Sequence, residues 1–253
     1  MGAISDGVAN ALIRRLEAYV RLSADDRKAL LLAAGEGIRT FDARRDLMRE
    51  GDEPRVVNLI LSGWACRYKT LPDGRRQIVA LFVPGDLCDP HIYILKRMDH
   101  NVGAITPVTA AQVGRDSFER LISERPRIVQ ALWWHELVVT AIQREWTLNI
   151  GQRTAYERMA HLMVEMFLRL QTVGMAEGNS IEWPLTQLDL ADATGLTPVH
   201  VNRTLQAMRR DGLIELAGRR LTILDMAALK STAMFNPEYL HLEHEGAHLD
   251  ANE

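Results

Sequence analysis

The chain has 253 residues, and its 30 basic and 33 acidic side chains leave a net charge of −3. This length suffices for one large domain or two ordinary ones, and an apolar content of 47% is typical of a folded protein. Because no global positive charge draws the chain to nucleic acid, any such contact needs a local basic patch. Only two cysteines occur, Cys66 and Cys88, which excludes a four-cysteine zinc site or iron–sulfur cluster within one chain.

The chain shows no signal for a membrane or for export. No apolar run approaches the roughly 18 uncharged residues of a membrane-spanning helix, and the N-terminus lacks the basic head and apolar core of a signal peptide. We therefore expect a cytoplasmic protein with no membrane contact.

The first half of the chain changes from helical to β texture. Residues 8–33 follow a helical period, and Ser23 is placed to cap a second helix. From Ile38 to about Val113, short apolar runs alternate with turn signals, which predicts antiparallel strands in a compact roll or barrel. Asp73-Gly74 lies between two such runs and predicts the tip of a hairpin.

The next segment predicts helices. A short helix spans 117–124, and a long one begins at Pro126 and continues to about Asn149, where Ile150-Gly151 is expected to form a hinge. Apolar residues in the long helix recur alternately every four and three positions, as in a coiled coil. We interpret this seam as a dimer interface, with packing on its own domain as the alternative. The proposed dimerisation residues are Ile128, Leu132, His135, Val139, Ile142 and Trp146, followed by Asn149.

Residues 185–223 carry the clearest functional pattern. Thr186 caps one short helix, Gly195 supplies the positive φ of a tight turn, and Thr197-Pro198 starts a second helix. Two helices joined by such a turn, the second with polar and basic residues facing outward, are typical of a helix-turn-helix that reads DNA. A helical hairpin with an ordinary polar surface is the alternative. The helix-turn-helix is favoured because the helix cap, the glycine turn, the basic helix face and a following strand pair with a basic tip, the wing, occur in the expected order. The expected DNA-binding residues are Thr197, Val199, His200, Asn202, Arg203 and Gln206, with Arg219 and Arg220 in a wing between two short strands.

The pattern Ala191, Gly195-Leu196-Thr197, Val201-Asn202-Arg203, Leu205 and Gly212-Leu213-Ile214 resembles the Crp/Fnr family of bacterial transcription regulators. Gly85-Asp86-Leu87 in the roll, the long helix and Arg158-Met159-Ala160 extend the resemblance over about residues 15–230. It implies an α+β chain that forms a homodimer on a palindromic operator. The implied parts are an effector-sensing β-roll domain with N-terminal helices at 1–125, a dimerisation helix at 126–150, a winged helix-turn-helix domain at 151–235 and an acidic tail at 236–253.

The resemblance also assigns roles on DNA. Arg203 matches the arginine that reads a guanine in the major groove, the commonest specific contact between protein and DNA. Val199 stands where many relatives carry a base-reading glutamate and would offer only an apolar contact, such as with a thymine methyl. Arg219 and Arg220 are expected on the phosphate backbone. The implied partners are double-stranded DNA, a second copy of the chain and RNA polymerase.

The effector pocket departs from the cyclic-nucleotide binders of the family. In our alignment Met98 and Asp99 replace the Arg-Ser pair that clamps the phosphate, so we expect no ordinary response to cyclic AMP. A cofactor stays unidentified: His91 matches the haem ligand of carbon-monoxide-sensing relatives, and no metal site is predicted. The candidate pocket residues are Gly85, Asp86, Leu87, Cys88, His91, Arg97, Gln143 and Arg144.

The sequence is compared with two other classes of function by the motifs that each requires. A cyclic-nucleotide- or haem-binding regulatory module that acts on a protein partner is the alternative to a DNA-binding regulator, and operator binding separates the two. An enzyme is not expected, since no nucleophile elbow, glycine-rich phosphate loop or HExxH motif occurs.

Overall fold

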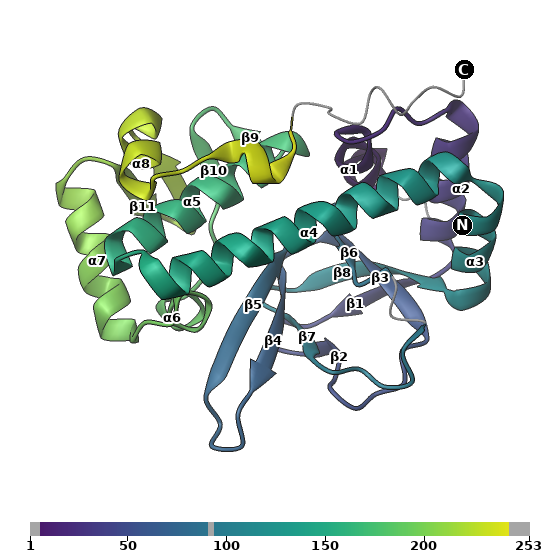
Figure 1. The fold of residues 1–253 in the computed structure, drawn as a ribbon, viewed down its shortest axis with the longest axis horizontal. Helices are drawn as coiled ribbons and strands as arrows, with labels where there is room; N and C mark the ends of the chain where they lie inside the picture. Colours follow the sequence, from purple (N-terminus) through teal and green to yellow (C-terminus); the bar gives the residue numbers. More distant parts are fainter. Residues whose placement is uncertain (1–5, 91–93, 243–253) are drawn as a thin grey trace. The chain divides into compact units, whose positions relative to one another are not determined.

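The computed structural model describes the backbone of residues 6–90 and 94–242. It describes the side chains of these residues from Ala11 onward. The chain forms two compact units (Figure 1). Of the described residues, the first unit contains 6–68, 81–90, 94–140 and 241–242, and the second contains 69–80 and 141–240. None of the described helices is long and apolar enough to cross a membrane.

Two four-stranded antiparallel sheets form a β-roll, as the alternation of apolar runs and turn signals predicts. Most of the roll belongs to the first unit, and its residues 69–80 belong to the second. One sheet has the order β1-β8-β3-β6 and the other has the order β2-β7-β4-β5. Side chains from both sheets, including Phe41, Ile60, Val102 and Val108, form the core of the roll. The strands are β1 (Ile38–Phe41), β2 (Asp46–Met48), β3 (Val56–Ser62), β4 (Ala65–Thr70), β5 (Arg76–Phe82), β6 (Leu87–Cys88), β7 (Asn101–Ala104) and β8 (Val108–Gly114).

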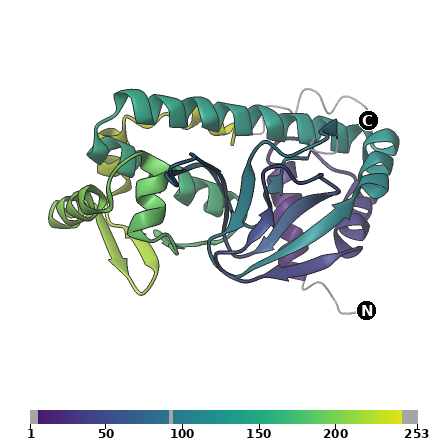
Figure 2. The same cartoon turned by 90° about the horizontal axis from the view of Figure 1, so that it is seen from below.

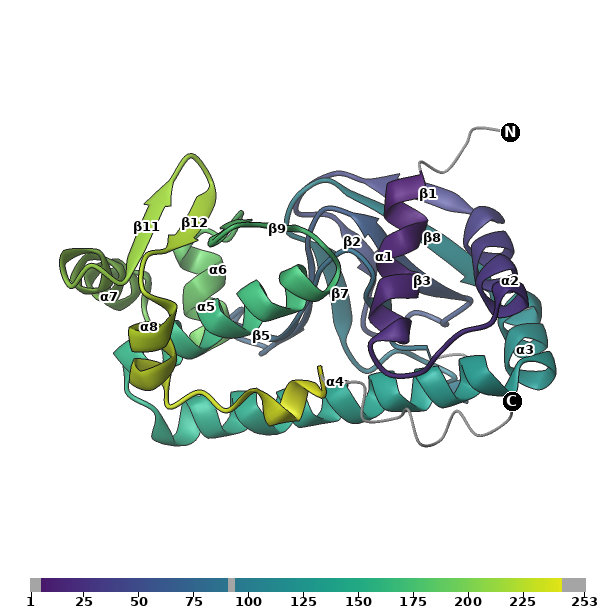
Figure 3. The same ribbon diagram turned by 90° about the horizontal axis from the view of Figure 1, so that it is seen from above.

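Three helices cover the β1-β8-β3-β6 sheet: α1 (Asp6–Glu17), α2 (Ala24–Gly35) and α3 (Arg115–Glu124). Ser23 caps α2 in a reciprocal box with Asp26, which confirms the expected helix start. Helix α1 lies across this sheet (Figure 3) and packs on the turn before β6. Gly85 there has φ +91°, and a Cβ at this position would lie 2.7 Å from the carbonyl oxygen of Ala11. Only glycine fits a turn of this conformation under α1.

The long helix α4 (Pro126–Gln152) extends further than its sequence predicts. Gly151 lies inside the helix, so the expected hinge at Ile150-Gly151 is wrong, and the helical hydrogen bonding ends instead before Thr154. Thr154 begins the next helix by capping it in a box with Glu157. One glycine near a helix end weakens a helix by only about 1 kcal/mol relative to alanine, which the neighbouring turns can overcome.

The second unit is a winged helix-turn-helix. Helix α5 (Ala155–Thr172) packs on α6 (Gln187–Thr194), α7 (Pro198–Arg210) and α8 (Met226–Ala233). Its sheet has the order β11-β12-β10-β9, and the strands are β9 (Ala176–Glu177), β10 (Ser180–Glu182), β11 (Ile214–Ala217) and β12 (Arg220–Ile223). The segment between α5 and α6 thus contains a small hairpin, formed by β9 and β10. Its strands are too short to show an alternating pattern in the sequence.

The first part of the predicted acidic tail is ordered. Residues 237–240 form a short 3₁₀ turn, η2 (Pro237–Leu240), in which Leu240 is buried and Tyr239 bonds to α5. The predicted acidic tail therefore begins with an ordered turn, which the buried Leu240 and the bond from Tyr239 hold against the second unit. Residues 243–253 lie outside the described part of the chain.

Candidate DNA-recognition site

The turn between α6 and α7 is fixed by local side-chain chemistry. Thr186 caps α6 in a reciprocal box with Asp189, and Gly195 ends the helix in the left-handed conformation with φ +66°. Thr197 then caps α7 through a 3.2 Å bond from the amide of His200, and Pro198 occupies the first helical position. The structure thus confirms each start and stop signal that the sequence predicts here.

Helix α7 has one buried face and one exposed face. Val201, Thr204, Leu205 and Met208 are buried in the second unit. The opposite face presents Val199, Asn202, Arg203 and Gln206, all exposed. No hydrogen bond or ion pair within the described part of the chain engages the side chains of Asn202, Arg203 or Gln206. The structure therefore leaves three hydrogen-bonding side chains on one helix face available to a ligand.

The remaining predicted DNA contacts differ in how available they are. The Thr197 hydroxyl is occupied by the cap, and His200 is half-buried. Arg219 lies between β11 and β12, the yellow-green hairpin of Figure 2, and has φ +62°. Its side chain is exposed. Arg220 instead forms an exposed ion pair with Glu177 at 2.8 Å. Arg219 is the freer of the two wing arginines.

Two further residues hold this unit together behind the recognition face. Arg158 donates to the carbonyl of Thr194 in the turn and, at 3.0 Å each, to the carbonyls of Ile150 and Arg153. Burial lowers the pKa of Arg158, although a guanidinium stays charged at neutral pH. Tyr156 donates a 2.7 Å bond to Asp211 just beyond α7, and burial followed by this bond raises the pKa of Tyr156 to about 12.

Comparison with known proteins identifies both units. Residues 157–232 match the Crp-like helix-turn-helix domain, and residues 38–125 match the cyclic nucleotide-binding domain. The transcriptional activator protein FnrL of Cereibacter sphaeroides is 32% identical over 199 residues, which are 77% of this chain and 79% of that protein. The chain belongs to the Crp/Fnr family of transcriptional regulators.

Other relatives agree with this assignment. The nitrogen fixation regulation protein FixK of Bradyrhizobium diazoefficiens is 32% identical over 195 residues, or 76% of this chain and 80% of that protein. The solved structure of FixK2 from Bradyrhizobium japonicum has the same fold, with a TM-score of 0.70 and 24% identity over 78% of this chain and 96% of that one. This Crp/Fnr chain is a DNA-binding transcriptional regulator and not an enzyme.

Four of the candidate effector-pocket residues of this Crp/Fnr roll lie in its interior. Gly85, Asp86, Leu87 and Cys88 are all buried. The Asp86 carboxylate accepts from the amide of Val83 at 2.8 Å and pairs with Arg15 of α1 at 3.0 Å, and both charged side chains are 5% exposed. A buried carboxylate held in this way is not available to a ligand.

A second cluster of charged side chains surrounds Asp89, three residues after Asp86 in the chain. Asp89 accepts from Arg67 and, at 2.9 Å, from His100, which also lies 2.6 Å from the exposed Asp99. Burial lowers the pKa of His100, but its bond to Asp89, the charge of that group and the bond to Asp99 outweigh burial, so the net shift is upward. Arg67 and Asp89 neutralise each other inside the roll, and His100 completes the cluster.

The other pocket candidates do not converge on one site. Cys88 belongs to the core of the roll, where burial and then the charge of Asp89 raise the pKa of its thiol, so it offers neither a reactive thiolate nor an accessible haem ligand. Arg97 is exposed and contacts the carbonyl of Gly51 at 3.4 Å. Gln143 and Arg144 are exposed on the part of α4 that belongs to the second unit. His91 lies outside the described residues.

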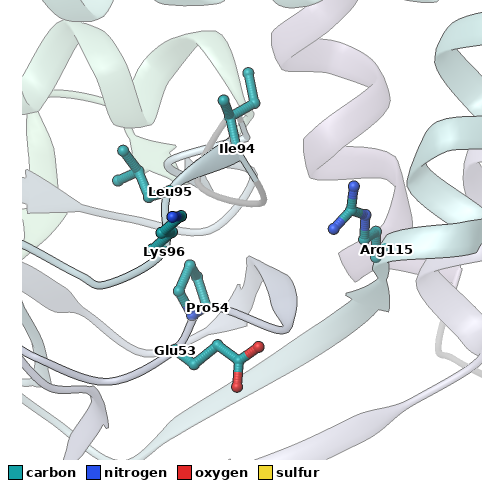
Figure 4. Close-up of a pocket in the computed structure, with 6 residues that line it drawn as sticks. All are labelled: Glu53, Pro54, Ile94, Leu95, Lys96 and Arg115. Carbon is teal, nitrogen blue, oxygen red and sulfur yellow. The ribbon is translucent and has the colours of Figure 1, made fainter.

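The roll also carries a surface hollow of about 440 Å³ (Figure 4). Glu53 and Pro54 line one side, and Ile94, Leu95, Lys96 and Arg115 line the rest. Arg115 is already paired with Glu119 at 2.7 Å, and Ile94 is 73% exposed. Opposite charges and exposed walls make this hollow an ordinary surface feature. Among the described residues, no group of three histidine, cysteine or acidic side chains is placed to hold a metal ion.

The predicted dimer seam is buried within the chain itself. Ile128, Leu132, His135, Ile142, Trp146 and Asn149 are all at most 7% exposed, and Val139 is half-buried. Heptad spacing marks a buried helix stripe without saying which surface covers it, and the burial of these residues within a single chain favours the alternative of packing on their own domain. A different face of α4 is open: Trp133 is 71% exposed and Leu137 is 55% exposed.

A polar clasp in the second unit includes none of the predicted functional residues except Trp146. Glu165 is fully buried and accepts from Trp146 of α4 at 3.1 Å, from Tyr239 at 3.0 Å and from Arg169 at 3.4 Å. Burial raises the pKa of Glu165, and the three donors oppose that shift. The clasp joins α4, α5 and the segment after α8. Its only signal in the sequence is an acid within the apolar run of α5.

Proposed function

We propose that the protein is a homodimeric regulator that binds a palindromic operator through α7, contacts the phosphate backbone with its wing, and acts without cyclic AMP. The observation that carries the DNA part of the proposal is the uncommitted polar face of α7, with Arg203 at its centre. Arginine pairs bidentately with guanine, and amide side chains such as Asn202 and Gln206 pair with adenine. Arg219, at the exposed wing tip, supplies a phosphate contact that positions the unit without reading sequence.

The dimer uses the open face of α4 in this proposal. Trp133, Leu137, Thr140 and Arg144 recur at spacings of four, three and four, and all are exposed. Trp133 and Leu137 present an apolar pair that water would otherwise surround, and a second copy of the same helix covers it by two-fold symmetry. Two α7 helices would then read half-sites about one turn of DNA apart.

The roll works without a cyclic nucleotide in this proposal because its own ion pairs engage Asp86 of the candidate pocket and Asp89 close to it in the chain. Arg15 holds Asp86, and Arg67 and His100 hold Asp89. Met98, which stands at the phosphate clamp in our alignment, is 2% exposed in the core of the roll. Opening either buried pair leaves an uncompensated charge, which costs about 3–5 kcal/mol.

The names of the relatives support the finer assignments. FnrL is named a transcriptional activator, so we propose that this protein activates transcription in the cytoplasm and does so through RNA polymerase. The competing function is that of a regulator that acts only on a protein partner. Such a regulator would not need the exposed polar face of α7.

Binding measurements on the purified chain test the proposal. Duplexes selected from a random pool should share a palindrome, and light scattering should show two chains per complex. Calorimetry and operator titrations with cyclic AMP and cyclic GMP should show no binding of either nucleotide and no change in operator affinity. Micromolar nucleotide binding that tightens operator binding would contradict the effector part, and the absence of any selected sequence would contradict the DNA part.

A further inference from the structure

Val199 is the most exposed large apolar side chain in the described part of the chain, at 79%. It lies in the first turn of α7, on the face that otherwise carries the polar side chains of Asn202, Arg203 and Gln206. From Val201 onward the helix follows one rule: every exposed residue is polar, and the apolar Val201, Leu205 and Met208 are buried. Val199 breaks that rule at the end of the helix that enters the major groove first.

The local geometry holds this side chain in one place. Thr197 caps the helix and Pro198 fixes the backbone of its first position, so the first turn is preorganised. A β-branched valine has one strongly preferred rotamer in a helix, so its two methyl groups have a fixed direction. Val199 and Arg203 are one turn apart on the same face. A rise of 1.5 Å per residue separates them by about 6 Å along the axis, roughly two base-pair steps.

The chemistry of the major groove limits what such a side chain can recognise. Valine neither donates nor accepts a hydrogen bond, so it cannot read the edges of guanine, cytosine or adenine. The 5-methyl group of thymine is the one apolar group that the groove presents. On the proposed function as a DNA reader, we propose that Val199 recognises the methyl group of a thymine within about two base pairs of the guanine that Arg203 reads.

The experiment replaces thymine by deoxyuridine, which pairs identically and lacks only the methyl group. An operator is first selected with the full chain, and each thymine of one half-site is then exchanged in turn. We expect one position per half-site to lose about fourfold in affinity, the worth of one buried methyl group, and roughly 15-fold when both half-sites are changed. Thymines elsewhere in the operator should tolerate the exchange.

Variants assign the effect to the side chain. Val199→Ala should bind the thymine operator more weakly and become indifferent to uracil at that position, whereas Val199→Thr, which keeps one methyl group, should retain part of the sensitivity. Arg203→Ala should weaken binding but keep the response to uracil, because the two contacts are separate. Val199 and Arg203 are both exposed in the folded chain, so the three variants should unfold at the temperature of the wild-type chain. Thermal unfolding therefore serves as the control.

The outcomes separate this inference from the proposed function. A selected operator with no uracil-sensitive thymine, or undiminished sensitivity in Val199→Ala, overturns the role of Val199 while leaving DNA recognition intact. Failure to select any operator overturns the proposed function itself.

Discussion

Removing one hydroxyl from the clasp around Glu165 should destabilise the second unit measurably. Tyr239→Phe deletes the donor that lies 3.0 Å from the buried carboxylate and keeps the ring, which stacks on His161 at a centroid distance of 5.8 Å. A hydrogen bond to a charged group contributes about 1.5–3 kcal/mol, and Glu165 is fully buried, so water cannot replace the lost donor. We expect a loss of about 2 kcal/mol in the free energy of unfolding.

Tyr156→Phe supplies a matched control for this prediction. It removes the same hydroxyl from a tyrosine whose acceptor, Asp211, is exposed, so water takes over the bond and the expected loss is below about 1 kcal/mol. Urea denaturation followed by tryptophan fluorescence compares the two variants, and hydrogen exchange of the α5 amides locates the loss. Equal losses in both variants would show that the Glu165 clasp contributes no more than a surface bond.

Three other properties follow from the same structure. Leu137→Asp, on the open face of α4, should give a monomer by light scattering and abolish operator binding, whereas Val139→Asp should act first on folding; a dimeric Leu137→Asp would contradict the proposed face. Burial, followed by the charge of Arg153, lowers the pKa of His161 to about 3 from 6.5. The free energy of unfolding should therefore fall by up to about 1.4 kcal/mol per pH unit as the pH drops below 6.5. Thermal unfolding of His161→Gln should show a smaller dependence on pH. Arg219→Ala should weaken binding to all DNA sequences alike and reduce the slope of log affinity against log salt concentration by about one, and a change in base preference would contradict its role on the backbone.

The winged helix-turn-helix could be predicted because its signals are local. Thr186, Gly195 and Thr197-Pro198 each fix the backbone of their own turn, whatever packs around them. The roll was predictable for the same reason, since turn residues at regular spacing separate its strands. The order of those strands in the two sheets depends on contacts distant in sequence, which local patterns do not contain.

Which surfaces cover α4 and Glu165 could not be predicted from local patterns. The period of α4 shows that one stripe is buried, but Trp146 is covered by its own chain, and only the folded structure shows that Trp133 is exposed. From the sequence alone Glu165 would be placed on the surface, because charged residues are usually solvated. Its burial depends on three hydrogen-bond donors, one of which, Tyr239, lies 74 residues away in the chain. The ordered turn at Tyr239 was missed together with it.

The most direct test of the central claim measures the base preference of Arg203→Ala. Affinity is determined for the selected operator and for every single-base variant of one half-site, with the wild-type chain and with the variant. Recognition by α7 predicts that Arg203→Ala loses about 1–3 kcal/mol per half-site on the matched operator and no longer discriminates at one base pair, while preferences elsewhere persist. An unchanged preference at every position would show that α7 is not the recognition helix.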